Sequence, residues 1–183
     1  MGHRLSKIYT RTGDAGDTGM ADGARLGKDH PRVHVLGELD ELSSVLGLIR
    51  CELAEDHPVA TAICQIQHEL LDLGAEFALP HLQLLASVAV TRLEQEIDDM
   101  NVLLGPLKEF LLPGGTRAAA SAHLARAVAR RLERRMVELS RLETLPGAAL
   151  PYVNRLSDWL FVAARHLLHG AGGRELLWHH QRR

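Results

Sequence analysis

The sequence predicts an all-α protein, a bundle of helices preceded by a polar segment. Of its 183 residues, 46% are apolar but only 4% are aromatic, so Leu, Ala, Val and Ile must build the core. These residues suit packed helices better than a β-sandwich. From about residue 30 onward, apolar side chains recur at intervals of three and four, which indicates amphipathic helices. The length fits one domain over 1–183, divided into a polar segment at 1–30, a bundle at 31–170 and a tail at 171–183.

The first three helices follow from this periodicity. We expect the first to begin after Asp29 as its N-cap, with Pro31 in the first turn, because proline is tolerated where a helical N–H would be unpaired. A second is predicted from about Val59 to Leu79. A shorter third is predicted around residues 93–100.

Two more helices follow a turn made by Pro113 and two glycines. The first is predicted from about Thr116 to Glu143 and is rich in alanine, which favours helix formation and close packing, so we expect it to be central. The last is predicted from about Pro151 to Leu168. Four long helices and one short element fit a bundle of the up-and-down type.

Charge and cysteine content limit the class of function. The net charge of −2 gives no general attraction to nucleic acid or an anionic membrane, so any affinity for phosphate must come from a local cluster. Cys51 and Cys64, without CxxC spacing, suit a reducing compartment. No segment reaches about 18 uninterrupted apolar residues, and the first residues lack the apolar stretch of a signal peptide. Met1, Gly2 and Ser6 match the bare myristoylation pattern, which often occurs by chance. We therefore expect a cytoplasmic protein.

An excess of arginine distinguishes the alanine-rich helix. Its basic residues are Arg117, Arg126, Arg130, Arg131, Arg134, Arg135 and Arg141, opposed by Glu133, Glu138 and Glu143, which leaves a local charge of +4 (seven minus three). The guanidinium group can bind phosphate oxygens through two hydrogen bonds. Arg126, Arg130 and Arg134 are spaced i, i+4, i+8 and so share one face. The pattern indicates an oxyanion site, although a solvated face with ion pairs inside the helix is the alternative.

The stretch IYTRTGDAGDTGM at 8–20 has the pattern of neither a strand nor a helix. Its glycines and threonines can offer backbone N–H groups and hydroxyls to phosphate oxygens, and Lys28 follows. It is not a P-loop, since no GK[ST] follows the glycines, and Asp14 and Asp17 lack EF-hand spacing. The alternative is a plain flexible arm.

Six features in order resemble one known family. They are YTRTGDAGDTG at 9–19, Lys28, GELDELSSVLG at 37–47, EFLLPGGT at 109–116, HLARAVARRLER at 123–134 and PYVNRLSDWLFVAAR at 151–165. Together they resemble the PduO-type ATP:corrinoid adenosyltransferases. The resemblance implies a five-helix bundle that assembles as a homotrimer with active sites at the subunit interfaces. It also implies transfer of the 5′-deoxyadenosyl group of ATP, with Mg²⁺, to the cobalt of cob(I)alamin, which yields adenosylcobalamin and triphosphate.

The resemblance also assigns roles to residues. The residues implied to wrap the triphosphate are Thr10, Arg11, Thr12, Gly13, Thr18, Gly19 and Lys28. Those implied to complete the nucleotide site from the helices are Arg130, Arg131, Glu133, Arg134 and Asn154. Arg126 would pair with Asp40 across the subunit interface, and Phe110 would pack at the corrin and displace the lower ligand of cobalt. Arg130, Phe110, Asp40 and Arg126 are thus the expected catalytic residues.

Two positions depart from the family pattern. Leu132 stands where a smaller residue is expected, and residues 81–90 fit no family block, so we expect a loop there. A flavoprotein reductase and a cobalamin-dependent enzyme are the further partners that the reaction suggests. No nucleic acid and no membrane are expected as partners.

The chemistry agrees with the absence of a Ser/His/Asp or Cys/His arrangement. Cobalt in its lowest oxidation state is a strong nucleophile that attacks C5′, so no side-chain base is needed. Arginine, lysine and backbone N–H groups stabilise the charge that develops on the departing triphosphate. Correct placement of cobalt opposite the leaving oxygen supplies much of the remaining rate.

Other residues carry simpler expectations. His166, His169, His179 and His180 are interpreted as surface residues rather than a metal site, and the acidic run of Glu94, Glu96, Asp98 and Asp99 as a solvated face. His123 is either a corrin contact or a packed interior histidine. Trp159 and Phe161 are expected in the core or at a subunit contact.

Two other functions are compatible with the same residues. One is a non-catalytic protein that binds ATP or adenosylcobalamin on this scaffold; Asp40, Phe110, Arg126 and Arg130 occurring together argue against it. The other is an RNA-binding bundle that uses the arginine helix, which lacks an aromatic platform for stacking bases.

Overall fold

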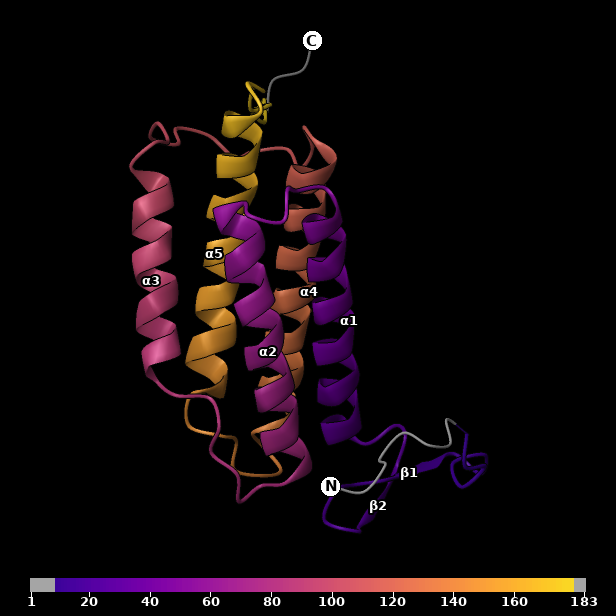
Figure 1. Cartoon of the computed structure of the whole chain (residues 1–183). Helices are drawn as coiled ribbons and strands as arrows, with labels where there is room; N and C mark the ends of the chain where they lie inside the picture. The colour runs from indigo at the N-terminus through magenta and orange to yellow at the C-terminus, as the bar shows by residue number, and fades with distance from the viewer. Residues whose placement is uncertain (1–8, 180–183) are drawn as a thin grey trace.

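The structure, a computed structural model that describes residues 9–179, consists of five helices and one short hairpin (Figure 1). The helices are α1 (Pro31–Cys51), α2 (Pro58–Ala78), α3 (Val88–Asn101), α4 (Arg117–Leu139) and α5 (Ala149–Gly170). The strands β1 (Asp17–Gly19) and β2 (Arg25–Gly27) pair antiparallel. The predicted all-α bundle is confirmed.

Two helices begin at a histidine followed by a proline. Nδ1 of His30 accepts a hydrogen bond of 3.1 Å from the N–H of Arg32, and His57 caps α2 in the same way. The proline has no N–H to leave unpaired at the first helical position. The N-cap of α1 is therefore His30 and not Asp29, because an imidazole nitrogen supplies the acceptor that usually comes from Ser, Thr, Asp or Asn.

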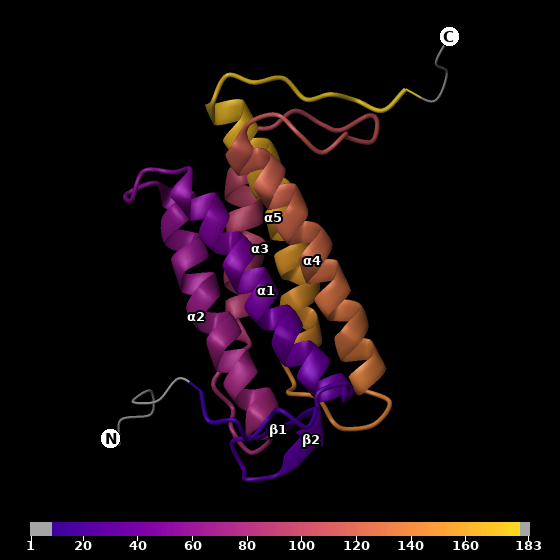
Figure 2. The same ribbon diagram turned by 90° about the vertical axis from the view of Figure 1, so that its right-hand side faces the viewer.

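The helices run alternately up and down, and α4 packs between α1 and α5 (Figure 1). Helix α2 packs on α1, and α3 packs on α5. The hairpin lies at the end of the bundle where α1 begins. At the opposite end, the loop of residues 102–116 and the segment after α5 lie side by side (Figure 2). This arrangement separates the polar N-terminal segment from the loop that carries Phe110.

The buried side of α4 is built from small residues. Its fully buried or nearly fully buried alanines are Ala118, Ala119, Ala122, Ala125 and Ala129. Their size lets α1 and α5 approach the α4 backbone closely, while the arginines between them occupy other faces. Thr116 caps this helix by accepting a hydrogen bond of 3.1 Å from the N–H of Ala119. The expectation that this helix is central is confirmed.

Several expectations about local structure were wrong. Residues 17–19 of the N-terminal segment form β1, which had not been expected, and α3 begins at Val88, inside the stretch 81–90 that we expected to be a loop. Helix α4 ends at Leu139, before Glu143. These differences concern short elements and helix ends, where pattern signals are weakest.

The acidic run on α3 is not simply solvated. Glu96 accepts a hydrogen bond of 2.7 Å from Nε1 of Trp159, which is buried on α5, and also pairs with Arg92. Glu94 pairs with Arg155 of α5. The run therefore fastens α3 to α5, and Trp159 is a core residue as expected.

Neither a membrane span nor a disulfide occurs among residues 9–179. None of their helices is long and apolar enough to cross a bilayer, and Cys51 and Cys64 are both free. The myristoylation pattern at Met1, Gly2 and Ser6 lies outside the described residues, as does His180.

Candidate active site

Four arginines of α4 form no ion pair with a carboxylate among residues 9–179. One is Arg117, in the first turn of the helix, and the other three are Arg126, Arg130 and Arg134, which the sequence placed on one face. By contrast, Arg131 pairs with Glu38 and Glu41 of α1, and Arg135 pairs with Glu138 of its own helix. Because none of Arg126, Arg130 and Arg134 forms an ion pair in the described part of the chain, this row of three guanidinium groups is suited to an external anion.

A hollow of about 590 Å³ opens beside two of these arginines. It is lined by residues 107–111 of the loop before α4, Arg126 and Arg130 of α4, and Ser157, Asp158, Phe161 and Val162 of α5. We call it the arginine hollow. Its wall combines guanidinium groups with apolar and aromatic surface, as a ligand that is both anionic and apolar would require.

Arg126 is held in the wall without a complete set of hydrogen bonds. Its guanidinium carbon lies 5.8 Å from the centre of the Phe161 ring, a cation–π contact, and its Nε is buried with no partner among residues 9–179. A buried donor without an acceptor is costly and is normally satisfied. Phe161 lines the hollow and is therefore part of the candidate site rather than core alone.

His123 lies behind Phe161. Only 8% of it is exposed, and its ring meets Phe161 edge-on with centroids 6.1 Å apart. Burial, followed by the positive charge of Arg126, lowers the pKa of His123 below its ordinary value, and Glu175 opposes this shift. Of the two interpretations left open by the sequence, the packed interior histidine fits the described residues.

The lowered pKa of His123 predicts a pH dependence of stability. The unfolded chain takes up the proton first as pH falls, so the stability due to neutral His123 is present above about pH 6.5 and is lost below it. We expect the free energy of unfolding to fall less steeply from about pH 7 to about pH 5 in His123→Leu than in the parent chain. Urea unfolding at several pH values measures this slope.

His68, which is exposed on α2 and contributes to neither the His123 nor the His166 shift, supplies the matched control. His68→Leu should leave the slope unchanged. Equal slopes in His123→Leu and the parent chain would show that His123 is not held neutral by the fold. The pKa of His166 is also lowered by burial, so part of the slope remains in either variant.

Phe110 projects from the loop before α4 at the rim of the hollow. It is 79% exposed, unusual for a phenylalanine, and its ring meets Trp178 edge-on with centroids 6.5 Å apart. Trp178 was missed from the sequence because it follows the last helix and belongs to none of the family blocks. An exposed aromatic pair beside a hollow is a suitable surface for a large apolar ligand.

Residues 9–28, which contain β1 and β2 and are called the hairpin from here on, include residues that the sequence assigned to the triphosphate. Thr10 and Thr12 share a hydrogen bond of 2.8 Å between their hydroxyls. A Cβ on Gly13 would lie 3.4 Å from Nζ of Lys28, so the ammonium group lies beside the glycine. Thr18 is on β1, opposite Leu26. Threonine hydroxyls, a close glycine and an ammonium group thus lie near one another.

Arg25 orders this hairpin. Its Nη2 donates to the carbonyl oxygen of Thr12 and to Oδ1 of Asp17, each at 2.5 Å. The hydrogen bond from Arg25 lowers the pKa of Asp17 below its ordinary value. Arg11 has a φ of 60°, a left-handed conformation rare for arginine, and its guanidinium lies 5.5 Å from the centre of the Tyr9 ring. These contacts give the segment a defined structure. The alternative interpretation, a plain flexible arm, does not account for them.

The hairpin and the arginine hollow do not meet within one chain. No residue of the hairpin lines the hollow. The hairpin lies at one end of the bundle, and the loop of residues 102–116 that carries Phe110 lies at the other (Figure 1). Asp40, exposed on α1, and Arg126 form no ion pair with each other. The expected residues therefore form two separate groups on the single chain.

Of the other residues expected at the nucleotide, Glu133 and Asn154 contact each other, whereas Arg131 contacts α1. Glu133 accepts a hydrogen bond of 2.9 Å from Nδ2 of Asn154, so α4 and α5 meet there. Arg131, which we expected at the nucleotide, is instead held by Glu38 and Glu41, with Nε 2.6 Å from Glu38 Oε2. Two carboxylates raise its pKa and satisfy its charge. In the single chain Arg131 thus joins α4 to α1.

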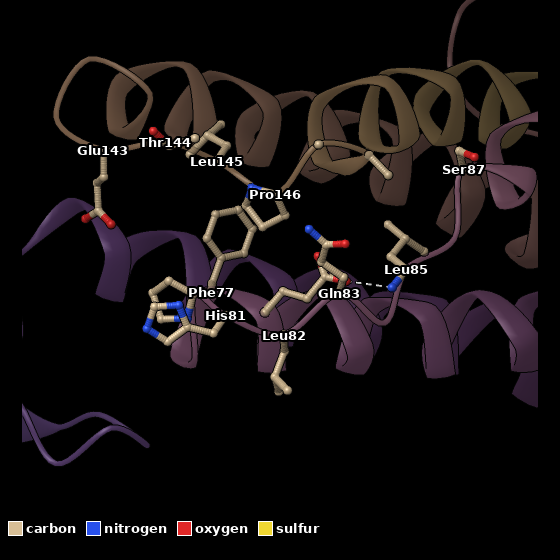
Figure 3. A pocket seen from close by; sticks show the side chains of 14 residues that line it. Phe77, His81, Leu82, Gln83, Leu85, Ser87, Glu143, Thr144, Leu145 and Pro146 are labelled. Carbon is tan, nitrogen blue, oxygen red and sulfur yellow. Dashed lines mark hydrogen bonds between the residues drawn. The ribbon is translucent and has the colours of Figure 1, made fainter.

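A second hollow, of about 540 Å³, lies at the hairpin end of the bundle, between the loops that follow α2 and α4 (Figure 3). Glu76, only 2% exposed, is one of its lining residues, and its Oε1 accepts hydrogen bonds of 2.5 and 2.6 Å from the N–H groups of Leu84 and Leu85. The carboxylate thus orders the loop after α2. None of the predicted site residues lines this hollow.

Among residues 9–179, no group of three or more His, Cys, Asp or Glu side chains is arranged to hold a metal ion. His166 and His169, on α5, belong to no such group.

Comparison with known proteins gives one consistent result. The family model described as cobalamin adenosyltransferase matches residues 8–167. A cobalamin adenosyltransferase of Cupriavidus metallidurans is 48% identical over 182 residues, which cover 100% of this chain and 99% of that protein. The corrinoid adenosyltransferase PduO of Salmonella typhimurium is 42% identical over 164 residues, which cover 86% of this chain but 48% of the longer relative.

A solved structure has the same fold. It is a phenylalanine-to-alanine variant of the PduO-type ATP:corrinoid adenosyltransferase from Lactobacillus reuteri, complexed with cobalamin and ATP. The TM-score is 0.90 at 34% sequence identity, and the match covers 94% of this chain and 99% of that one.

Proposed function

The chain belongs to the cobalamin adenosyltransferase family and is an ATP:corrinoid adenosyltransferase, and we propose that the arginine hollow and the N-terminal hairpin are the two parts of its active site. It transfers the 5′-deoxyadenosyl group of ATP to the cobalt of cob(I)alamin and releases triphosphate. One observation carries the proposed site: Arg126, Arg130 and Arg134 have no carboxylate partner in the described part of the chain.

The proposed roles follow from the electron flow of the reaction. Cobalt donates an electron pair to C5′, a cobalt–carbon bond forms, and the bond from C5′ to the triphosphate oxygen breaks. The departing oxygen keeps that pair, so negative charge grows on the triphosphate and not on the adenosyl group. Donors already fixed at this position stabilise the transition state more than the bound substrate. Arg130, in the wall of the hollow, is suited to this task.

The triphosphate would be shared between the two parts of the site. From the hairpin we propose Thr10, Arg11, Thr12, Gly13, Thr18, Gly19 and Lys28. From the helices we propose Arg130, Glu133, Arg134 and Asn154, with Glu133 and Asn154 orienting each other. Arg131 would reach the nucleotide only by releasing Glu38 or Glu41, so it has the least structural support in this set.

We propose that Mg²⁺ accompanies the nucleotide. The described residues fit this role because magnesium commonly binds substrate phosphates with few protein ligands, and no protein cage is needed. When bound, the ion neutralises part of the triphosphate charge. The protein's own part is to surround the phosphates with arginine, lysine and backbone N–H groups.

The corrinoid would lie at the loop end of the hollow. Phe110 presents an exposed ring there, and we propose that it packs against the corrin and displaces the lower ligand of cobalt. An apolar ring in that position keeps the axial base and water away, which makes cobalt easier to reduce. Phe161, which also lines the hollow, would extend the apolar surface.

We propose a homotrimer in which the hairpin of one subunit completes the hollow of the next. Two observations support this: the two parts do not meet within one chain, and the buried Nε of Arg126 has no described partner. The exposed carboxylate of Asp40 from a neighbouring subunit would supply an acceptor for Arg126. A cytoplasmic location, a flavoprotein reductase and a cobalamin-dependent enzyme that receives the product complete the proposal.

Mixed trimers test the shared site. Lys28→Ala impairs the hairpin and Arg130→Ala impairs the hollow, so each variant alone should be nearly inactive. If a site takes its hairpin and its hollow from different subunits, equal co-production should restore about a quarter of the parent activity, since one pairing in four joins two intact parts. Mixtures no more active than the separate variants would contradict a shared site.

Product analysis tests the reaction itself. An anaerobic single turnover with ATP and reduced cobalamin should give the spectrum of a cobalt–alkyl compound and one equivalent of triphosphate. A non-catalytic binding protein would bind both compounds without this change. ADP and phosphate as products would contradict attack at C5′.

A further inference from the structure

The loop that carries Phe110 has little structure of its own. Between α3 and α4, residues 102–116 contain no helix, and within the described chain their one regular pairing is the antiparallel bridge between Leu111 and Leu177. We call residues 102–116 the Phe110 loop and residues 171–179 the C-terminal segment. Two backbone hydrogen bonds join them: the N–H of Leu112 to the oxygen of Leu176 at 2.8 Å, and the N–H of Trp178 to the oxygen of Phe110 at 2.7 Å.

These two bonds lie on either side of the bridge, so they fix the backbone at Phe110 itself. The edge-on contact between Phe110 and Trp178 adds a side-chain restraint. Figure 2 shows the two segments extending together beyond the helices. The position of the Phe110 ring therefore depends on where the C-terminal segment is held.

One buried side chain holds that segment to the bundle. Arg165 of α5 is 6% exposed, and its Nε donates to Oε1 of Glu175 at 2.6 Å. Its Nη2 donates to the carbonyl oxygen of Gly105 at 2.9 Å. A single guanidinium thus connects α5, the start of the Phe110 loop and the C-terminal segment.

The packing around Leu168, also on α5, makes the same connection. A Cβ on Gly173 would lie 2.2 Å from Cδ1 of Leu168, and a Cβ on Gly115 would lie 2.6 Å from the same atom. Gly115 has a φ of 93°, which favours glycine whatever the space around it, whereas Gly173 is not among the glycines with positive φ. Both segments are thus pressed against α5 next to Arg165.

A buried ion pair adds little net stability, because the cost of removing both charges from water offsets their attraction. Its geometric effect is larger, since a planar guanidinium with fixed donor directions restricts where its partners can lie. We propose that Arg165 is a positioning residue for the corrinoid reaction, which holds Glu175 and Gly105 so that Phe110 stays at the arginine hollow. The inference rests on the proposed function of Phe110.

The test uses two variants and one matched control. Arg165→Met keeps an unbranched buried side chain and removes all the donors. Glu175→Ala removes both acceptor oxygens of the partner, which lies in the C-terminal segment and is partly exposed, and so leaves the bundle intact even if Arg165→Met fails to fold. Arg174→Gln removes a charge from the exposed residue next to Glu175 and should behave as the parent chain.

Hydrogen exchange gives a readout that is independent of activity. In both variants the amides of Leu112 and Trp178 should exchange about tenfold faster or more, because the bonds that they donate are no longer held in place, while amides in α1 and α2 keep their rates. The control should show no change at either position.

The second readout is the cobalt coordination of bound cob(II)alamin. Nitrogen splitting in its electron paramagnetic resonance spectrum reports whether the lower ligand is attached. The splitting should persist in the two variants, with turnover roughly 10- to 100-fold lower and the KM for ATP unchanged. Parent-like exchange and parent-like cobalt spectra in folded variants would overturn the inference.

Phe110→Ala separates this inference from its premise. If Phe110→Ala retains the lower ligand but Glu175→Ala and folded Arg165→Met do not, the role of Phe110 stands and the positioning role of Arg165 fails. If Phe110→Ala has no effect on cobalt coordination, the premise fails and the inference fails with it.

Discussion

Arg130→Lys is expected to lose most of its turnover while the protein keeps its fold and assembly. Lysine retains the positive charge but not the planar pair of donors, so the charge growing on the departing triphosphate would meet a single ammonium group. Loss of one donor from a site that stabilises a developing anion costs roughly 100-fold or more in kcat. Single-turnover rates with ATP and reduced cobalamin measure this effect directly.

Arg135→Lys is the matched control on the same helix. Arg135 pairs with Glu138 at the surface of α4, and this exposed pair contributes little. The Arg135→Lys variant should react at nearly the parent rate. If Arg130→Lys reacts as fast as Arg135→Lys, the unpaired row of arginines is not the triphosphate site.

Phe110→Ala is expected to bind ATP normally and to fail in its handling of the corrinoid. The ring lies at the loop end of the hollow, away from the hairpin, so its removal leaves the proposed phosphate contacts intact. Without it, the axial base and water can reach cobalt, and we expect the reaction to slow by roughly 100-fold. Titration with ATP and anaerobic cobalamin spectra separate the two effects.

Leu103→Ala provides the comparison for Phe110→Ala. Leu103 is also an exposed apolar residue of the same loop, but it does not line the hollow. Its replacement should change neither ATP binding nor the cobalamin spectra. Equal behaviour of the two variants would contradict the assignment of Phe110.

The sequence predicted the helices because each has an apolar stripe long enough to show its period. It also predicted the useful face of α4, since the i, i+4 spacing fixes Arg126, Arg130 and Arg134 on one side whatever packs on the other. The hairpin was not predicted because its strands have three residues each, too short for an alternation to appear.

The contacts between distant segments could not be predicted by pattern. Arg131 finds Glu38 at a separation of 93 residues, and no local rule selects that partner over a phosphate. The same holds for Arg165 and the bridge between Leu111 and Leu177, which depend on two irregular segments lying side by side. The proposed sharing of the active site between two subunits is still harder to predict from the sequence, because a single chain contains the two parts of the site but not their contact.

Buried alanines precede two of the arginines on α4, and this limits which substitutions the helix can accept. Arg126 and Arg130 each follow a fully buried alanine, Ala125 and Ala129. A bulkier residue at either alanine would push α4 away from its neighbours and carry the adjoining guanidinium with it. Mutational drift toward other nucleotides or corrinoids is therefore expected to accumulate in the hairpin and the Phe110 loop, while the inner side of this helix stays invariant.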